Sequence, residues 1–417
     1  MRTVKWNPFL SGAMMLLGGV LLWAGAARAD ISSTNSAAIV VFPKLVVDTS
    51  GGLDTVIQLT NTAPHPVNVR CFYVNANGHC SDDPVDICDP GEPASNFCGS
   101  GAYCKPGWVE TDFAIRLTTN QPIAWTVSAG LSALPLSQEQ LSGPNGEIDG
   151  GSIPQANEDP MIGELKCVEV GDDERPVDSN DLKGEATIEY IDSTLPQVDI
   201  EGYNAIGIQA VPGHCIDDAG VLCTADSDCA TADAGTCVHV NNRDNTLVLG
   251  EEYNACPSSL ILDHFFDEAH VLNDEIRTYL TLVPCSEDFN TQLPIRTVVQ
   301  FLVYNEFEQR FSTSRALTCF SELVLSDIDT RLGDLDDNDD VSIFNVGMEG
   351  TLTGQTIIRG VADPTNPAGN GLLGVAEEFH ELDAGSHPNY SAAYMLDMRG
   401  TRTQKDVIQM PPASPAQ

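Results

Sequence analysis

The amino-acid sequence predicts an all-β protein made of antiparallel, immunoglobulin-like β-sandwich domains with disulfide-rich loop insertions. Three observations support this prediction. Apolar and polar residues alternate over short runs bounded by turn residues, as in strands with one buried face. Helical periodicity is weak after residue 30. Two long polar stretches contain clustered cysteines, so crosslinks must replace the core that such stretches cannot form by burial.

The clearest strand pattern is Leu53–Val74, LDTVIQLTNTAPHPVNVRCFYV. Alternating residues precede and follow a turn marked by Pro64 and Pro66, because proline fixes φ and cannot donate a ladder hydrogen bond. We expect two strands folded back on each other, as in an antiparallel sandwich. Residues 276–283 and 295–304 repeat this design, which predicts a second strand–turn–strand unit.

The order of strand-like runs and turn-rich stretches predicts several domains behind a secretion signal. Arg2 and Lys5 precede an apolar run, and Ala27-Arg28-Ala29 fits a cleavage site, so we expect a mature chain that starts near Asp30. The predicted organisation is a signal peptide at 1–29, an N-terminal β-sandwich at 30–131 with a cysteine-rich insertion at 75–106, a linker at 132–160, a middle β region at 161–255 with a cysteine-rich insertion at 213–240, and a C-terminal β-sandwich at 256–417.

The chain is strongly acidic, with 60 Asp and Glu residues, 20 Lys and Arg residues and a formal net charge of −40. The signal peptide contains three of the basic residues, so the mature chain would carry 17 basic against 60 acidic residues, a net charge of −43. Nucleic acids and anionic membranes bind basic surfaces, so neither is an expected partner. No stretch after the signal is long and apolar enough to predict a transmembrane segment.

All 13 cysteines follow the signal and none forms a C-x-x-C pair, which favours disulfides over zinc in an exported protein. The odd count leaves at least one thiol unpaired or bonded to another chain. Cys285 and Cys319 are candidates for a bridge across the two sheets of the C-terminal sandwich, whereas spacing alone does not pair the cysteines of the insertions. The candidate disulfide cysteines are Cys80, Cys88, Cys98, Cys104, Cys215, Cys223, Cys229, Cys237, Cys285 and Cys319.

Two acidic clusters are candidate calcium sites, because Ca²⁺ prefers oxygen ligands. The run 334–340 places oxygen donors at alternating positions as in an EF-hand loop, but Asp339 replaces the turn glycine and Asn345 the closing glutamate. Asp226 and Asp228 lie in the second cysteine-rich insertion. A solvated acidic surface is the alternative for both clusters. The candidate metal ligands are Asp334, Asp336, Asn338, Asp340, Asp226 and Asp228.

His264 and His270, with Asp267 between them, form the densest group of histidine and carboxylate side chains. Such a group offers metal ligands or a general acid–base pair, but it lacks the H-E-x-x-H spacing, and a structural or surface role is the alternative. The sequence contains neither a G-x-S-x-G nucleophile motif nor a glycine-rich phosphate loop. No catalytic residue is therefore predicted.

The segment TVIQLTNTAPHPVNVRCFYVN, residues 55–75, resembles the first strands of bacterial extracellular immunoglobulin-like modules, including adhesion-related ones. These modules pair a strand ending in L-x-N-T with a returning P-V-x-V strand. Segments such as GELKCVEV, GEATIEY, NEFEQRFSTS and GTLTGQT resemble an exported bacterial family without an assigned role. The resemblance implies a fold and a compartment, and it transfers no catalytic residue.

These observations favour an exported, non-enzymatic β-sandwich protein for surface binding, adhesion or structural assembly, secreted or held in the periplasm or at the cell surface. The insertions at 75–106 and 213–240 are the expected contact surfaces for an extracellular protein or glycan, because long loops on a rigid scaffold carry recognition. One alternative is an extracellular hydrolase or carbohydrate-active enzyme that uses carboxylates or a metal near His264 and His270. A second alternative is a polymerising coat or filament subunit.

Overall fold

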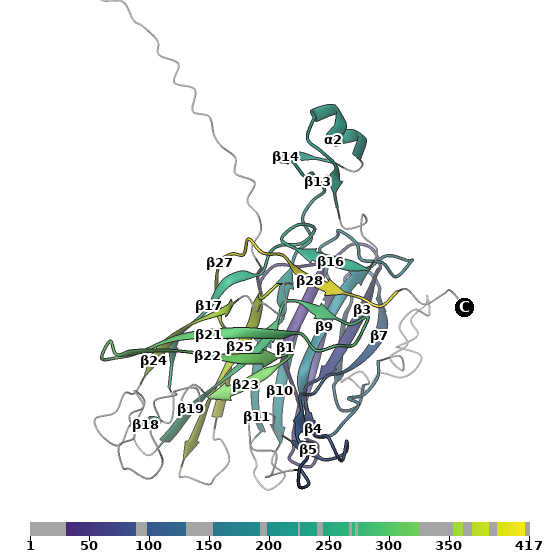
Figure 1. Ribbon diagram of the computed structural model, residues 1–417. Helices are drawn as coiled ribbons and strands as arrows, with labels where there is room; N and C mark the ends of the chain where they lie inside the picture. Colours follow the sequence, from purple (N-terminus) through teal and green to yellow (C-terminus); the bar gives the residue numbers. More distant parts are fainter. Residues whose placement is uncertain are drawn as a thin grey trace, which may run out of the picture.

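The computed structural model describes residues 31–88, 98–130, 153–191, 198–223, 226–239, 245–266, 269–271, 274–324, 353–361, 369–382 and 390–412. Within these ranges nearly all regular structure is β-strand, and the only helix is the short α2 (Asp226–Ala232). The strands pair antiparallel except for one parallel pair, β20 (Glu287–Asp288) with β28 (Asp406–Gln409). The predicted all-β class is confirmed, and Figure 1 shows the strands arranged in layers.

Two sheets form the first sandwich and enclose a common core. Sheet I contains β1 (Ile39–Val47), β3 (Val67–Asn75), β7 (Val109–Leu117), β9 (Met161–Val170) and β12 (Ile206–Ile208), and sheet II contains β2 (Leu53–Asn61), β8 (Pro122–Thr126), β10 (Leu182–Ile191) and β11 (Val198–Asn204). The strand orders are β12-β1-β9-β3-β7 and β11-β10-β2-β8. Side chains from both sheets, among them Phe42, Leu59 and Trp125, are buried in one hydrophobic cluster. Burial of these apolar faces is the main force that holds the two sheets together.

β2 and β3 flank the turn predicted at Pro64 and Pro66, but they do not pair with each other. β2 pairs with β8 and β10, whereas β3 pairs with β7 and β9. The turn therefore carries the chain from sheet II to sheet I, which corrects the expected folding of one strand back on the other. The Asn61 side chain fixes this crossing, because its Nδ2 donates to the carbonyl oxygen of His65 at 2.7 Å and to that of Thr118 at 2.9 Å.

The second sandwich has the same kind of layout. Sheet III contains β17 (Pro257–Phe265), β21 (Arg296–Asn305), β22 (Arg310–Thr318), β24 (Gly354–Val361) and β27 (Asp397–Thr401), and sheet IV contains β18 (Ala269–Val271), β19 (Asp274–Pro284), β23 (Ser321–Val324), β25 (Leu372–Leu382) and β26 (Tyr390–Met395). The orders are β22-β21-β24-β17-β27 and β18-β19-β25-β26, with β23 also paired to β19. β19 and β21, the strands of the second predicted unit, again lie in different sheets. Both units are therefore crossings between two sheets.

Sheet I is buried on both faces at β1, β3, β9 and β12, whereas β7 has one exposed face. Its outer face packs against a bridging sheet formed by β16 (Thr246–Leu249), β28 and β20, and against Tyr253 and Phe289. Phe72 on β3 stacks on Phe289 with ring centroids 4.3 Å apart. This double burial explains why β1 has the nearly continuous apolar sequence IVVFPKLVV rather than an alternating one.

Four strands of the predicted middle region, β9 to β12, belong to the first sandwich. β9 lies between β1 and β3, and β10 lies beside β2. The predicted linker at 132–160 therefore lies in the chain between β8 and β9, two strands of the same sandwich, and its residues 132–152 lie outside the described ranges.

Twelve of the cysteines form six disulfides, and Cys319 is free and buried. Cys285 pairs with Cys256, which corrects the expected bridge from Cys285 to Cys319. Cys256 and Cys285 lie together in the hydrophobic cluster on the outer face of sheet I, outside the core between sheets III and IV. The disulfides are Cys71–Cys167, Cys80–Cys98, Cys88–Cys104, Cys215–Cys229, Cys223–Cys237 and Cys256–Cys285.

Candidate functional site

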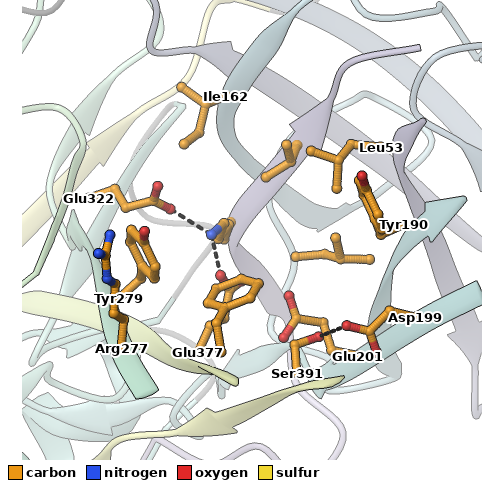
Figure 2. Close-up of a pocket in the computed structure, with 14 residues that line it drawn as sticks. Leu53, Ile162, Tyr190, Asp199, Glu201, Arg277, Tyr279, Glu322, Glu377 and Ser391 are labelled. Carbon is orange, nitrogen blue, oxygen red and sulfur yellow. Dashed lines mark hydrogen bonds and ion pairs between the residues drawn. The ribbon is translucent and has the colours of Figure 1, made fainter. Parts of the chain in front are cut away.

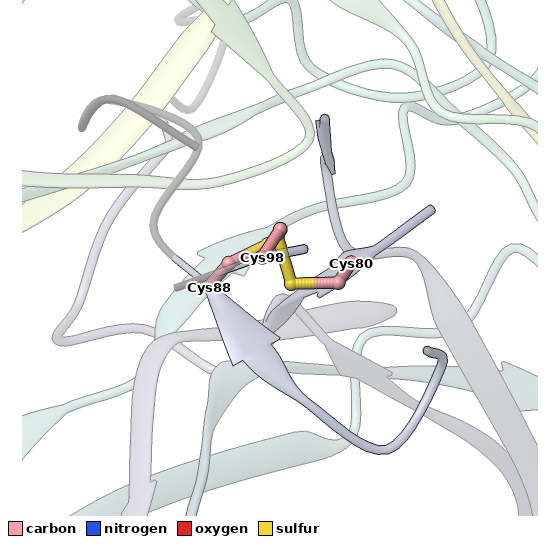
Figure 3. Close-up of side chains that lie close together, drawn as sticks. All are labelled: Cys80, Cys88 and Cys98. Carbon is pink, nitrogen blue, oxygen red and sulfur yellow. A yellow bond between two sulfur atoms is a disulfide. The ribbon is translucent and has the colours of Figure 1, made fainter. Parts of the chain in front are cut away.

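The first cysteine-rich insertion folds into a small sheet of three strands. These strands are β4 (Gly78–Cys80), β5 (Ile87–Cys88) and β6 (Cys104–Lys105), in the order β5-β4-β6. Two disulfides staple the sheet, and Figure 3 shows Cys88 beside the bridge from Cys80 to Cys98. The segments that join its strands expose apolar side chains, with 79% of Val85 and 61% of Tyr103 accessible to solvent.

The base of this insertion is held by Glu158. Its Oε2 accepts hydrogen bonds from Asn75 Nδ2 at 2.7 Å and from Asn77 Nδ2 at 2.8 Å, and its Oε1 lies 2.9 Å from His79 Nε2. Burial acts to raise the pKa of Glu158, but the hydrogen bonds from His79 and the two asparagines outweigh it and the pKa is lowered. A charged carboxylate with three partners makes this base rigid.

The second cysteine-rich insertion has a core made largely of its own disulfides. β13 (His214–Cys215), β14 (Asp218–Leu222) and β15 (Cys237–Val238) form its sheet, and α2 packs beside them. Asp226 and Asp228 are exposed in the first turn of α2, where Asp226 Oδ1 accepts a hydrogen bond from the Cys237 amide at 2.9 Å. In the described ranges no group of three carboxylate or histidine ligands includes these two aspartates.

The other predicted sites are placed only in part. The acidic run with Asp334, Asp336, Asn338 and Asp340 lies outside the described residues, as does Asp267. Calcium binding therefore stays a prediction. His264 is exposed on β17, with its ring stacked on Tyr394 at a centroid distance of 6.1 Å, and His270 belongs to β18 in the other sheet of the sandwich.

A cavity of about 400 Å³ lies where the first sandwich meets sheet IV. Strands β1, β2, β9, β10 and β11 line it from one side, and β19, β23, β25 and β26 line it from the other. The sequence gives no sign of this cavity, because its residues are up to 347 positions apart in the chain, from Lys44 to Ser391. Its wall includes the aromatic side chains of Tyr190, Tyr279 and Phe379.

Lys44 lies at the wall of this cavity in an ion pair with two carboxylates. Its Nζ is 2.6 Å from Glu322 and also contacts Glu377. Burial acts to lower the pKa of Lys44, but the charges of Glu322 and Glu377 outweigh it and the pKa is raised. The pairing of β1 with β9 is irregular between Phe42 and Leu45, a bulge of the kind that redirects a side chain. Pro43 is the sequence signal for this bulge.

Glu201 and Glu377 each keep a buried carboxylate oxygen, Glu201 Oε2 and Glu377 Oε1, that has no hydrogen-bond partner. Burial, and then the neighbouring charge of Glu377, raise the pKa of Glu201 to about 8. Asp199 lies beside Glu201 and accepts a hydrogen bond from Ser391 Oγ at 2.7 Å. Figure 2 shows these groups gathered on one side of the cavity. The acidic side chains of Asp199, Glu201 and Glu377 therefore lie together at one end of a wall of aromatic and aliphatic side chains.

Comparisons with known proteins give no guide to the site. In the described part of the chain, no helix is long and apolar enough to cross a membrane. No protein-family model matches the chain, and no curated protein is significantly similar to it.

Proposed function

We propose that the chain is an exported, non-enzymatic binding protein, and that the first cysteine-rich insertion is its main contact surface for an extracellular protein or glycan. The observation that supports this proposal is the exposure of Val85 and Tyr103, which lie next to the strands of a small sheet held by two disulfides. Ile87 is also exposed there. Apolar side chains on a rigid, water-facing element favour binding, because little conformational entropy is lost when a partner covers them.

The disulfides support the expected compartment. Six bridges in one chain fit an oxidising environment outside the cytosol. The sequence at 1–29, with its basic start and its Ala27-Arg28-Ala29 cleavage pattern, agrees with export. We therefore place the binding surface outside the cell or in the periplasm.

The second insertion would act as a separate surface. Figure 1 shows β13, β14 and α2 at one end of the molecule and β4 and β5 at the other. One partner of ordinary size would not touch both. The second insertion also exposes apolar residues, Ile216 at 57% and Leu222 at 69%, so it is the natural second contact.

The experiment measures co-sedimentation of fluorescently labelled mature protein with cell envelopes of the producing organism. A triple variant, Val85→Ser, Ile87→Ser and Tyr103→Ser, removes the exposed apolar surface without touching the disulfides. We expect the triple variant to bind the envelopes with an apparent affinity at least tenfold lower, because it removes several apolar side chains that would contact the partner.

The matched control removes apolar residues of similar exposure elsewhere, Leu293→Ser and Phe307→Ser, which are 62% and 59% accessible. This control should sediment like the unmodified protein. Equal sedimentation of the triple variant, or no sedimentation of the unmodified protein, would refute the proposal.

The two alternative functions have weaker support. For the hydrolase, His264 is exposed on sheet III and stacks on Tyr394, and it is not among the described residues that line the cavity between the sandwiches. For the polymerising subunit, the odd cysteine is Cys319, which is buried in the folded chain. Cys319 is thus not exposed for a bond to a neighbouring copy.

A further inference from the structure

We propose that the cavity between the first sandwich and sheet IV binds an organic cation, an alkylammonium group carried on an apolar stem. The ammonium group would lie against Glu201 and Glu377, and the stem would lie along the aromatic wall. This binding would be independent of the first insertion, so it goes beyond the contact surface proposed above.

Two carboxylate oxygens at the cavity lack a hydrogen-bond partner. Glu201 is 6% and Glu377 is 1% accessible to solvent, and both line the cavity with a buried oxygen that lacks a partner. A buried carboxylate oxygen without a hydrogen bond is costly and rare in folded proteins. A ligand that donates hydrogen bonds into the cavity would remove this cost, and the three N–H groups of an ammonium reach two carboxylates at once.

The cavity is lined by more acidic than basic side chains. Four carboxyl groups, those of Asp199, Glu201, Glu322 and Glu377, line the cavity together with the cations Lys44 and Arg277. Lys44 is already engaged by Glu322 and Glu377. It is therefore not available to bind an incoming anion. The remaining carboxyl groups are on β11: Asp199, and Glu201, which becomes a second negative charge when it loses its proton. That excess favours a cation.

The wall of the cavity is largely aromatic and aliphatic. Tyr279 and Phe379 pack edge to face with centroids 5.2 Å apart, and Leu53 and Ile188 add aliphatic surface. Aromatic faces attract ammonium groups, and apolar walls take up a hydrocarbon stem. A simple metal ion would make no use of this wall. Among the described residues, moreover, no group of three carboxylate or histidine oxygens and nitrogens gathers here at ligand spacing.

The protonation of Glu201 adds a measurable signature. Glu377 on β25, Lys44 on β1, Asp199 on β11 and Ser391 on β26 surround its carboxyl group. Its pKa of about 8 means that the empty cavity holds a proton on Glu201 at neutral pH. An ammonium ion favours the ionised carboxylate, so binding should release that proton, and affinity should rise between pH 6 and about 8 by linkage.

The test is isothermal titration of the full mature chain with three probes that share one stem, namely hexylammonium, hexanol and hexanoate. We expect hexylammonium to bind at least tenfold more tightly than either of the others, with release of a proton at pH 7 that is seen by comparing two buffers of different ionisation enthalpy. A fourth probe, acetyl-Gly-Lys-Gly-amide, distinguishes the source of the ammonium. Binding of this peptide assigns the site to a lysine side chain of a partner, and binding of the free amine alone assigns it to a small molecule.

The variant Glu201→Gln should lose at least tenfold in affinity for hexylammonium and should lose the proton release. The matched control is Glu189→Gln on β10, because Glu189 pairs with Ile200, which is 55% exposed, and so belongs to the face of sheet II away from the cavity. Phe379→Leu tests the wall in a second way and should weaken binding several-fold. Equal binding of hexanol and hexylammonium, no binding of any probe, or unchanged binding by a folded Glu201→Gln variant would each overturn the proposal.

Discussion

Cys71 of β3 and Cys167 of β9 lie directly opposite each other in sheet I, and a disulfide joins them with their Cα atoms 4.1 Å apart. This bridge connects two neighbouring strands of one sheet, and neither cysteine was among the disulfide candidates predicted from the sequence. It spans 96 positions in the chain and locks β9 to the strands that precede the long connection. The regions 30–131 and 161–208 are therefore crosslinked parts of one sandwich.

The double variant Cys71→Ser, Cys167→Ser should strongly destabilise the first sandwich. A crosslink that closes a loop of 96 residues is worth about 4–5 kcal/mol in the chain-entropy model. We expect a loss of that size in the free energy of unfolding, measured by urea denaturation with tryptophan fluorescence, because Trp125 is in the core of this sandwich.

The control for this prediction is Cys223→Ser, Cys237→Ser. These cysteines belong to the small cluster of the second insertion, so their removal should leave the main unfolding transition within about 0.5 kcal/mol of its original position. A large shift in the control, or none in the sheet I variant, would contradict this account.

The sequence predicted the fold class and the positions of most strands, and the structure explains why it could not predict their partners. Strand alternation indicates that β2 and β3 each bury at least one face. It does not show which strands lie beside them, and the turn at Pro64 is compatible with a hairpin or with a crossing between sheets. Cys71 lies opposite Cys167 only because β3 pairs with β9 in this register. The spacing of cysteines in the sequence could therefore not predict this disulfide.

The candidate site was harder to predict for the same reason. Lys44 and Glu377 meet in the cavity although they are 333 positions apart. The local signal was Pro43-Lys44 within an apolar strand, where a charged residue in a buried run indicates a partner elsewhere. Nothing in the sequence selected Glu377 among 60 acidic residues.

The free thiol should be unreactive in the folded protein. Burial, and then the charges of Glu287 and Glu164, raise the pKa of Cys319 far above its usual range, and the thiolate is the form that reacts. We expect iodoacetamide to add no label at pH 8 in native conditions and one label per chain in denaturant without reductant, counted by intact-mass spectrometry. Native labelling or a disulfide-linked dimer would show that Cys319 is accessible.

Stability should fall as pH rises through neutrality, in part because of Glu169. Burial raises the pKa of Glu169 to about 7, although hydrogen bonds from Ser179 and the Asp181 amide oppose this. The folded state keeps a proton that the unfolded state releases near pH 4.5, so its stabilising effect is present below that pH and is lost as pH rises through 7.

The measurement is the slope of the unfolding free energy between pH 5 and 8. Glu169→Gln should make the decrease of the unfolding free energy with pH less steep, by at most about 1.4 kcal/mol per pH unit, which is the slope that one titrating proton contributes. Glu189→Gln, on the outer face of sheet II, should leave the slope unchanged. A variant Glu169→Gln with the original slope would assign the pH dependence to other groups.

Lys166 on β9 forms a fully buried ion pair that fastens sheet I to the bridging sheet. Its Nζ is 2.8 Å from Glu164 and 3.0 Å from Glu287 of β20. Burial, opposed in part by Lys166, raises the pKa of Glu287, so the lysine is what allows these carboxyl groups to share a dry site. Removing the cation alone should be costly, because it leaves uncompensated charge in the interior.

Lys166→Met should therefore lower the free energy of unfolding by about 3–5 kcal/mol, measured by urea denaturation at pH 7. The triple variant Glu164→Leu, Lys166→Met, Glu287→Leu replaces the whole group with apolar side chains of similar size. It should recover most of that loss, because none of the three charges then remains buried. If the triple variant is as unstable as the single one, packing around Lys166 and not its charge holds the two layers together.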